Sequence, residues 1–322
     1  MKRLWKVLFF FMLLAMILPV KTFARELLIP VGKVVGLQLR EDCVTVAAFD
    51  EALGSTAREA GLKIGDEILK ISGETVDCAE DILIALEAEP DTVSLTIRRG
   101  LTQHTIKLAP QDTPEGKRLG IHLRQGIAGI GTITWYNPET GLFGTLGHGV
   151  STGKGGLVRM TRGNAYEAEV ISVQKGKAGT PGQLRGNAEG LRICGTLLKN
   201  TPQGVFGIAE KGWTGQAIPT AVFSEVHTGC ATIRSTIAGD TVREYSVEIL
   251  KIYPEDRSDG RNFLLRVTDP ALLETTGGIV QGMSGSPIIQ DGRLVGAVTH
   301  VLVNQPDTGY GIFIENMLDA AS

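Results

Sequence analysis

The sequence of 322 residues has little of what marks several common protein classes. Beyond residue 24, no apolar run approaches the roughly 20 residues that a membrane-spanning helix needs. The formal net charge is −3, and a chain without a basic excess argues against nucleic acid as a partner. There is no internal repeat and no low-complexity tract, and a hydrophobic content of 43% excludes a disordered protein.

Cysteine is also scarce. The chain has four cysteines, which lie far apart with no C-x-x-C pair and no histidine at zinc-ligand spacing: Cys43, Cys78, Cys194 and Cys230. The sequence therefore predicts no metal site, and no cofactor of another kind. A Cys43–Cys78 disulfide, a Cys194–Cys230 disulfide and buried free thiols are all compatible with the pattern.

The first 24 residues have the pattern of an export signal. A basic start is followed by an apolar run from Val7 to Val20 and then by Thr22-Phe23-Ala24, a small-x-small pattern suited to signal peptidase. We expect residues 1–24 to be a signal peptide, or an N-terminal anchor if they are retained. The rest of the chain is then exported across the cytoplasmic membrane.

The remaining residues favour β structure in two domains. The 41 glycines are too many for a mainly helical protein and suit a chain with many turns. Residues 28–109 combine short alternating apolar runs with two helical stretches and form the first predicted domain. The polar residues 110–117 are the predicted linker. Residues 118–322, with many short strands separated by turns, form a second domain with the texture of a β-barrel.

Residues 60–73 (AGLKIGDEILKISG) resemble the signature of a PDZ domain, an α+β module that binds peptides. A helix ends at Gly61, the chain turns at Gly65-Asp66, and the glycines supply the positive φ angles that these turns need. PDZ domains bind the C-terminus of a peptide by adding it as a strand to their sheet. The predicted peptide-binding loop and strand are Val35, Gly36, Leu37, Gln38 and Leu39.

The second domain contains residues 282–287 (GMSGSP), which resemble the G-x-S-G-x-P nucleophile loop of chymotrypsin-like serine proteases. The expected fold is therefore mainly β, with a PDZ domain followed by a chymotrypsin-like double β-barrel. Ser284 is the predicted nucleophile. Glycines let a tight loop point the N–H groups of Gly282 and Ser284 at one spot, where the oxyanion of a tetrahedral intermediate would form.

A serine nucleophile needs a base, and His148 is the best candidate. It lies between two glycines at the end of an apolar run and precedes the serine in the chain, which is the chymotrypsin order. Thr299 and His300 follow the nucleophile at the place where such proteases pair with the substrate backbone. We therefore expect these two residues to line a substrate subsite.

The pattern leaves several candidates for the acid that completes a triad. It should lie between the histidine and the serine, where the candidates are Asp240, Asp256, Asp259 and Asp269. The apolar strand before Asp269 and the proline after it favour that residue.

The chain resembles the SpoIVB peptidase family of endospore-forming bacteria. The segments that carry the resemblance are residues 126–132 (GIAGIGT), 146–148 (LGH), 268–270 (TDP) with Leu272-Leu273, 277–287 (GGIVQGMSGSP) and 296–301 (GAVTHV). The resemblance implies His148, Asp269 and Ser284 as the catalytic residues. It also implies a protease exported into the space between the forespore membranes, which cuts itself and then a membrane-held regulator. This cleavage triggers processing of the mother-cell sigma factor precursor.

Two other functions compete with this one. A catalytically silent PDZ adaptor would not need both His148 and Ser284, and both are present. An envelope quality-control protease of the HtrA type shares the two modules but has its PDZ domain after the protease domain, the reverse of the predicted order.

Overall fold

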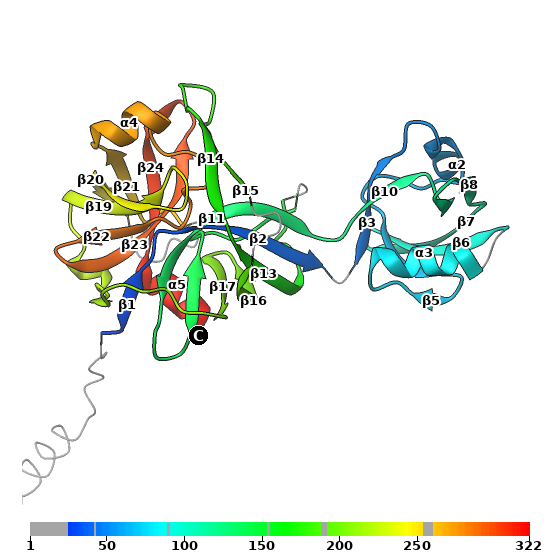
Figure 1. Ribbon diagram of the computed structural model, residues 1–322, viewed down its shortest axis with the longest axis horizontal. Helices are drawn as coiled ribbons and strands as arrows, with labels where there is room; N and C mark the ends of the chain where they lie inside the picture. The colour runs from blue at the N-terminus through cyan, green and yellow to red at the C-terminus, as the bar shows by residue number, and fades with distance from the viewer. Residues whose placement is uncertain (1–24, 42, 89–90, 153–154, 188–191, 254–259) are drawn as a thin grey trace, which may run out of the picture.

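The computed structural model describes residues 25–322 except 42, 89–90, 153–154, 188–191 and 254–259. The chain is mainly β, as predicted, and forms a double β-barrel with a smaller α+β domain beside it (Figure 1). The predicted export signal, residues 1–24, lies outside the described residues. In the part that is described, no helix is long and apolar enough to cross a membrane.

Six strands close the first barrel, and they come from both sides of the small domain. In order around the barrel they are β2 (Val34–Glu41), β11 (Ile127–Tyr136), β12 (Leu142–Thr145), β17 (Gly204–Ala209), β16 (Ile193–Thr201) and β13 (Met160–Glu167). Two short strands, β1 (Leu27–Pro30) and β18 (Ile218–Pro219), extend this sheet beyond β11. Alternate residues of these strands fill the barrel, with Phe143 and Val205 fully buried at its centre.

The second barrel follows without interruption. Its strands are β19 (Gly229–Thr236), β20 (Val242–Ile252), β21 (Phe263–Val267), β24 (Gln305–Phe313), β23 (Arg293–Leu302) and β22 (Pro287–Gln290). A short 3-10 turn, η1 (Phe223–Glu225), leads into it, and it also carries the helices α4 (Pro270–Thr276) and α5 (Ile314–Ala321). Its core includes Val247, Phe263, Ile288 and Phe313, all at most 2% exposed. Helix α5 packs on β23 and β24 and reaches β17, so the C-terminus joins the two barrels.

The small domain is inserted between β2 and β11 of the first barrel (Figure 1). Its sheet runs in the order β10 (Ile121–Arg124), β3 (Val44–Phe49), β4 (Glu67–Ile71), β6 (Val93–Arg99) and β7 (Thr102–Leu108), with β5 (Glu74–Thr75) beside β4. The helices α2 (Gly54–Glu59) and α3 (Ala79–Ala88) and the hairpin of β8 (Gln111–Thr113) and β9 (Gly116–Arg118) complete it. It has a hydrophobic core of its own, around Val44, Ile68 and Leu95.

The domain boundaries differ from those predicted. Residues 34–41 pair with β11 on one edge and β13 on the other, so they belong to the first barrel and not to the PDZ domain. Residues 111–124, expected as a linker and the start of the barrel, form β8, β9 and β10 of the PDZ domain. The small domain thus interrupts the double barrel instead of preceding it.

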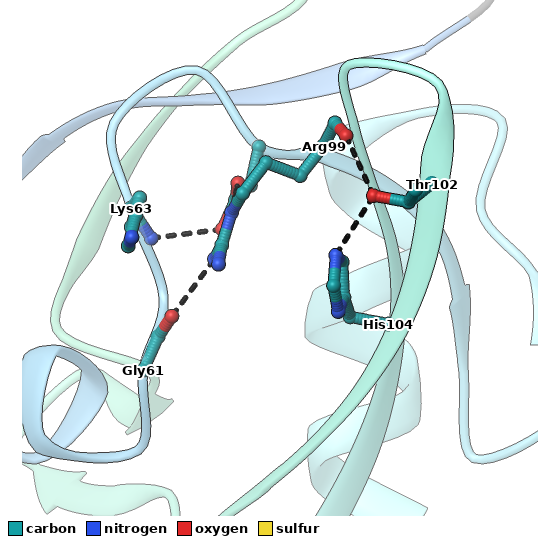
Figure 2. A network of polar contacts seen from close by, with 6 residues as sticks. Gly61, Lys63, Arg99, Thr102 and His104 are labelled. Carbon is teal, nitrogen blue, oxygen red and sulfur yellow. Dashed lines mark hydrogen bonds and ion pairs between the residues drawn. The ribbon is translucent and has the colours of Figure 1, made fainter.

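The PDZ signature forms the turn between α2 and β4, as its glycines predicted, with φ angles of 95° at Gly61 and 88° at Gly65. The Asp66 side chain, 1% exposed, accepts two hydrogen bonds from the Arg99 guanidinium, at 2.6 and 2.7 Å. Arg99 also donates to Gly61 O at 2.8 Å, and Lys63 N donates to Asp66 at 2.8 Å (Figure 2). The turn is therefore tied to the β6–β7 hairpin.

The cysteines form neither of the two disulfides considered above, because Cys78, Cys194 and Cys230 are free thiols. Burial raises the pKa of the Cys194 thiol to about 11, so this side chain behaves as a small core residue.

Candidate active site

The nucleophile loop lies between α4 and β22 of the second barrel, but a strand of the first barrel holds it. The fully buried Thr132 of β11 donates from Oγ1 to Gly282 O at 2.8 Å and from its backbone N–H to Ser284 O at 3.0 Å. Gly282 and Gly285 have φ angles of 99° and 94°, and a Cβ on Gly285 would lie 2.1 Å from Thr132 O. Only glycine fits so close an approach at such angles.

The backbone of this loop leaves two donors available. The N–H groups of Met283, Gly285 and Ser286 donate to nearby backbone carbonyls at 2.8–3.1 Å. Within the described residues, the N–H groups of Gly282 and Ser284 have no such acceptor. These are the two groups predicted to stabilise an oxyanion, and both residues line the same cavity.

His148 and Ser284 both line this cavity, which has a volume of about 450 Å³ and lies between the two barrels. His148 follows β12 at a turn where Leu146 and Gly147 have positive φ angles of 70° and 67°. A Cβ on Gly147 would lie 2.9 Å from Thr299 Cγ2, so glycine here lets the two barrels meet closely. The predicted base and nucleophile are therefore brought to one place by two barrels.

The His148 imidazole has the tautomer that a base needs. Its Nδ1 lies 3.0 Å from Gly149 O, and a carbonyl oxygen only accepts hydrogen bonds. In the neutral ring the proton is therefore on Nδ1, and Nε2 keeps its lone pair. Burial lowers the pKa of His148 below 6.5, although the Gly149 contact opposes this shift. The ring is consequently neutral at neutral pH and able to take a proton.

The predicted subsite residues also lie at this cavity. Thr299 O accepts a hydrogen bond from Ser284 Oγ at 2.9 Å, and the Thr299 hydroxyl donates to Gly260 O at 2.8 Å. The rings of His300 and His148 are 5.3 Å apart between centroids. Thr299 and His300 of β23 thus line the cavity beside the nucleophile and the base.

Asp269, the predicted third member, is not at the site. Its side chain caps α4, accepting from Leu272 N at 3.0 Å and from Ser246 N at 3.4 Å. Asp269 does not line the cavity, and the partner of His148 Nδ1 is Gly149 O. This corrects the prediction: a strand, an aspartate and a proline also describe a capped helix start.

The other acids considered do not replace it. Asp240 is exposed and lies 3.8 Å from the Lys33 ammonium. Asp256 and Asp259 lie outside the described residues. No carboxylate lines the cavity along the described ranges, and the partner of His148 Nδ1 there is the Gly149 carbonyl.

The residues predicted to bind peptide in the PDZ domain have a different role. Val35, Gly36, Leu37, Gln38 and Leu39 are inside β2, and both edges of β2 are already paired. No edge is free for strand addition, so this prediction is corrected. Leu37 and Leu39 instead line the catalytic cavity.

The cavity walls were not predicted from the sequence. They are apolar on both sides, with Leu39, Ile127 and Ile130 from the first barrel and Val280 and Val301 from the second. No lysine, arginine, aspartate or glutamate lines the cavity in the part of the chain that is described. The apolar residues of the segment 126–132 were the available signal, but they fit any buried strand.

The geometry allows acyl transfer. Ser284 Oγ can attack a peptide carbonyl carbon while its proton moves to His148 Nε2, and the oxyanion then lies near the Gly282 and Ser284 N–H groups. His148 can return that proton to the departing amine, so the peptide C–N bond breaks and an acyl-enzyme remains for water to hydrolyse. The fold and the site define a serine peptidase.

Comparison with known proteins identifies the family. The model of the SpoIVB peptidase S55 family matches residues 115–318, and the chain belongs to that family. The match begins inside the β8–β9 hairpin of the small domain, although β2, which precedes that domain, is needed to close the first barrel.

Three other similarities concern parts of the chain. The serine protease HTRA1 of Xenopus tropicalis is 41% identical over 56 residues, which are 17% of this chain and only 12% of that protein. The inactive form of the Rv3671c protease from M. tuberculosis is 14% identical, with a TM-score of 0.36, covering 60% of this chain and 82% of that one. The PDZ domain of the SdrC-like protein from Listeria monocytogenes is 21% identical, with a TM-score of 0.23, covering 26% of this chain and 87% of that one.

Proposed function

We propose that this serine peptidase is an exported endopeptidase of sporulation signalling, which cuts itself and then a membrane-held regulator between the forespore membranes. Cleavage of the regulator would trigger processing of the mother-cell sigma factor precursor. Membership of the SpoIVB peptidase family supports the proposal. The observation that carries the peptidase part is that Ser284, His148 and the N–H groups of Gly282 and Ser284 meet in one cavity.

The preferred substrate is apolar around the bond that is cut. Leu37, Leu39 and Ile127 form one wall of the cavity, and Val280 and Val301 form the other. A charged side chain buried there would lose its hydration without gaining a partner, which costs several kcal/mol or more. Apolar side chains would instead gain about 25 cal/mol per Å² of buried surface.

The PDZ domain would bind its peptide at β10, not at β2. Strand β10 is the outermost strand of the sheet, paired only with β3 within the described residues. Gly120, with a φ of 67°, leads into it, and Ile121 and Leu123 are half-buried against the core. A free edge beside apolar side chains is what strand addition requires.

Self-cleavage tests the proposal directly. Residues 25–322 should be purified and incubated alone, next to a Ser284→Ala variant, and the fragments should be sequenced from their N-termini. We expect fragments from the wild-type chain with apolar residues on either side of the cut, and none from the variant, which loses one oxygen and little volume. Equal fragmentation of both proteins would contradict the assignment of Ser284. Broad digestion of unfolded casein would favour the quality-control alternative.

The PDZ part needs a separate measurement. Hydrogen exchange of the Ser284→Ala chain, with and without a peptide that ends in an apolar residue, should show added protection at residues 121–124. The same peptide with an amidated C-terminus serves as the control and should bind weakly. Added protection at residues 34–41 instead would show that the peptide binds at β2.

A further inference from the structure

The peptide group between Gln281 and Gly282 is held from outside the nucleophile loop. Gln281 O accepts a hydrogen bond from Leu184 N at 2.8 Å, and Gln281 N donates to Gly182 O at 2.9 Å. Leu184 is the second residue of the return strand in a hairpin made of β14 (Glu169–Gln174) and β15 (Gln183–Asn187), which leaves the first barrel between β13 and β16. We propose that this hairpin positions the oxyanion hole, with the Leu184 N–H as the positioning group. The proposal rests on the function proposed above.

Peptide geometry explains why one hydrogen bond has this effect. A trans peptide group is planar, and its C=O and N–H point in opposite directions. Fixing Gln281 O toward Leu184 therefore turns the N–H of Gly282 the other way, toward the cavity. Gly282, with a φ of 99°, has no Cβ to resist rotation of that plane. Without the Leu184 N–H, the plane can turn over and present a carbonyl oxygen where the oxyanion forms.

Side-chain packing supports the same contact. Leu184 is fully buried and lies in the core cluster that contains Val280, just before the loop. A Cβ added to Gly282 would lie 3.1 Å from Leu184 Cβ, so the strand passes directly beside the peptide group that it holds.

The hairpin is itself fixed to the second barrel along its length. Gly176 N donates to Thr276 O at 2.8 Å, at the end of α4, and Gly179 N donates to Val303 O at 2.9 Å. At its base, Val170 and Gly239 exchange two backbone hydrogen bonds, at 2.7 and 2.9 Å. A segment of the first barrel thus reaches across to hold a catalytic peptide group of the second.

The test is a substitution that removes only the donor. Leu184→Pro deletes the N–H, and Leu184→Met keeps both the N–H and a buried apolar side chain of similar size. The probe is a fluorophosphonate: Ser284 Oγ forms a bond to phosphorus, fluoride leaves with the electrons of the P–F bond, and the serine proton moves to His148. The phosphoryl oxygen uses the oxyanion hole. We expect the maximal inactivation rate of Leu184→Pro to fall about 10²- to 10³-fold. The inhibition constant for initial binding should stay within about twofold of the wild-type value. Leu184→Met should equal the wild type in both quantities.

A change of cavity shape would instead raise the inhibition constant, and that result would contradict a positioning role. If Leu184→Pro does not fold, as judged by its circular dichroism, Gly182→Ala decides the question. Its Cβ would lie 2.5 Å from Gly176 N and 2.6 Å from Val280 Cγ1, which forces β15 away from Gln281. Wild-type inactivation rates in a folded Leu184→Pro or Gly182→Ala protein would overturn the role of the hairpin alone. A wild-type chain that does not react with the fluorophosphonate at all would also contradict the assignment of Ser284 as the nucleophile.

Discussion

The hydroxyl of Ser284 donates its hydrogen bond to the carbonyl oxygen of Thr299, at 2.9 Å, while the His148 ring makes its own contact with Gly149. In the free enzyme, the nucleophile is thus held by the strand that a substrate would meet. The His148 imidazole therefore binds and releases its proton without a hydrogen bond to the Ser284 hydroxyl.

This arrangement predicts that Ser284→Ala leaves the titration of His148 unchanged. The serine proton is directed at Thr299, so its removal takes nothing from the imidazole. NMR titration of His148 should give the same midpoint in both proteins, below the ordinary 6.5 because burial lowers the pKa of this ring. A midpoint that moves by half a unit or more would show that the two side chains are hydrogen-bonded in solution.

The same pKa shift predicts the acid side of the activity profile. Only the neutral imidazole accepts the proton of Ser284, so the rate falls as pH drops through the pKa of His148 in the folded protein. Because that pKa is lowered, the midpoint of the acid limb of kcat/KM for a peptide cut by the enzyme should lie below pH 6.5. An acid limb centred above 6.5 would mean that a negative charge stabilises the protonated ring.

Thr132→Val should weaken catalysis without touching the nucleophile. The change keeps the shape of a fully buried side chain but removes the hydroxyl that donates to Gly282 O at 2.8 Å. We expect a loss of about 1–3 kcal/mol in stability, because a buried carbonyl loses its donor. Turnover should fall about tenfold as the loop loosens, since tenfold corresponds to about 1.4 kcal/mol in the barrier. Thermal unfolding and steady-state kinetics measure the two effects, and the exposed Thr161→Val is a matched control.

Asp269→Asn should retain most of the activity, because asparagine caps a helix nearly as well as aspartate. Asp269→Ala should lower the free energy of unfolding by about 1 kcal/mol, since Leu272 N loses its acceptor. Stability and kcat should be measured for both variants, with Asp240→Asn, Asp256→Asn and Asp259→Asn beside them. A loss in kcat on the order of 10⁴ for Asp269→Asn, with a normal melting temperature, would restore it to the triad.

The Arg99 network of Figure 2 predicts how the PDZ domain responds to acid. Burial alone would raise the pKa of Asp66, but the hydrogen bonds from Arg99 and from Lys63 N outweigh it and lower the pKa below 3.8. The stability from the ionised carboxylate is therefore complete above pH 3.8 and is lost only as pH falls through the lower, folded value.

Arg99→Met should reverse this behaviour. It leaves a carboxylate that is 1% exposed without its guanidinium, and it should cost about 2 kcal/mol, less than for a fully buried pair because Arg99 is 31% exposed. Acid unfolding of the PDZ domain, followed by hydrogen exchange in the whole chain, should move to higher pH. An unchanged acid transition would mean that the ion pair is not formed in solution.

The parts of the structure that could be predicted from the sequence are those set by neighbouring residues. The turn at residues 60–73 and the loop at 282–287 each need glycine at fixed positions, so their patterns are specific. The mainly β fold and the peptidase family followed from such local patterns, and both are confirmed.

The parts that could not be predicted depend on distant partners. The apolar residues of 34–39 suit a PDZ edge strand as well as a barrel strand, and only pairing with Ile127–Tyr136 beyond the inserted domain decides between them. Asp269 follows a buried strand in both interpretations, and only its contact with Leu272 N shows that it caps a helix. Leu184 carries no local signal at all, because its role lies in a backbone N–H that every residue except proline has.

The insertion of the PDZ domain between β2 and β11 sets an order of events during synthesis. Leu39 of β2 can pair with Ile127 of β11 only after the residues between them have been made. The growing chain can therefore complete the PDZ domain while β2 is still unpaired. A folded insert also brings the two ends closer together, which lowers the entropy cost of closing so long a loop. The second barrel closes only when β24 pairs with β21 and β23. Because His148 comes from the first barrel and Ser284 from the second, the base and the nucleophile come together only after both barrels have closed.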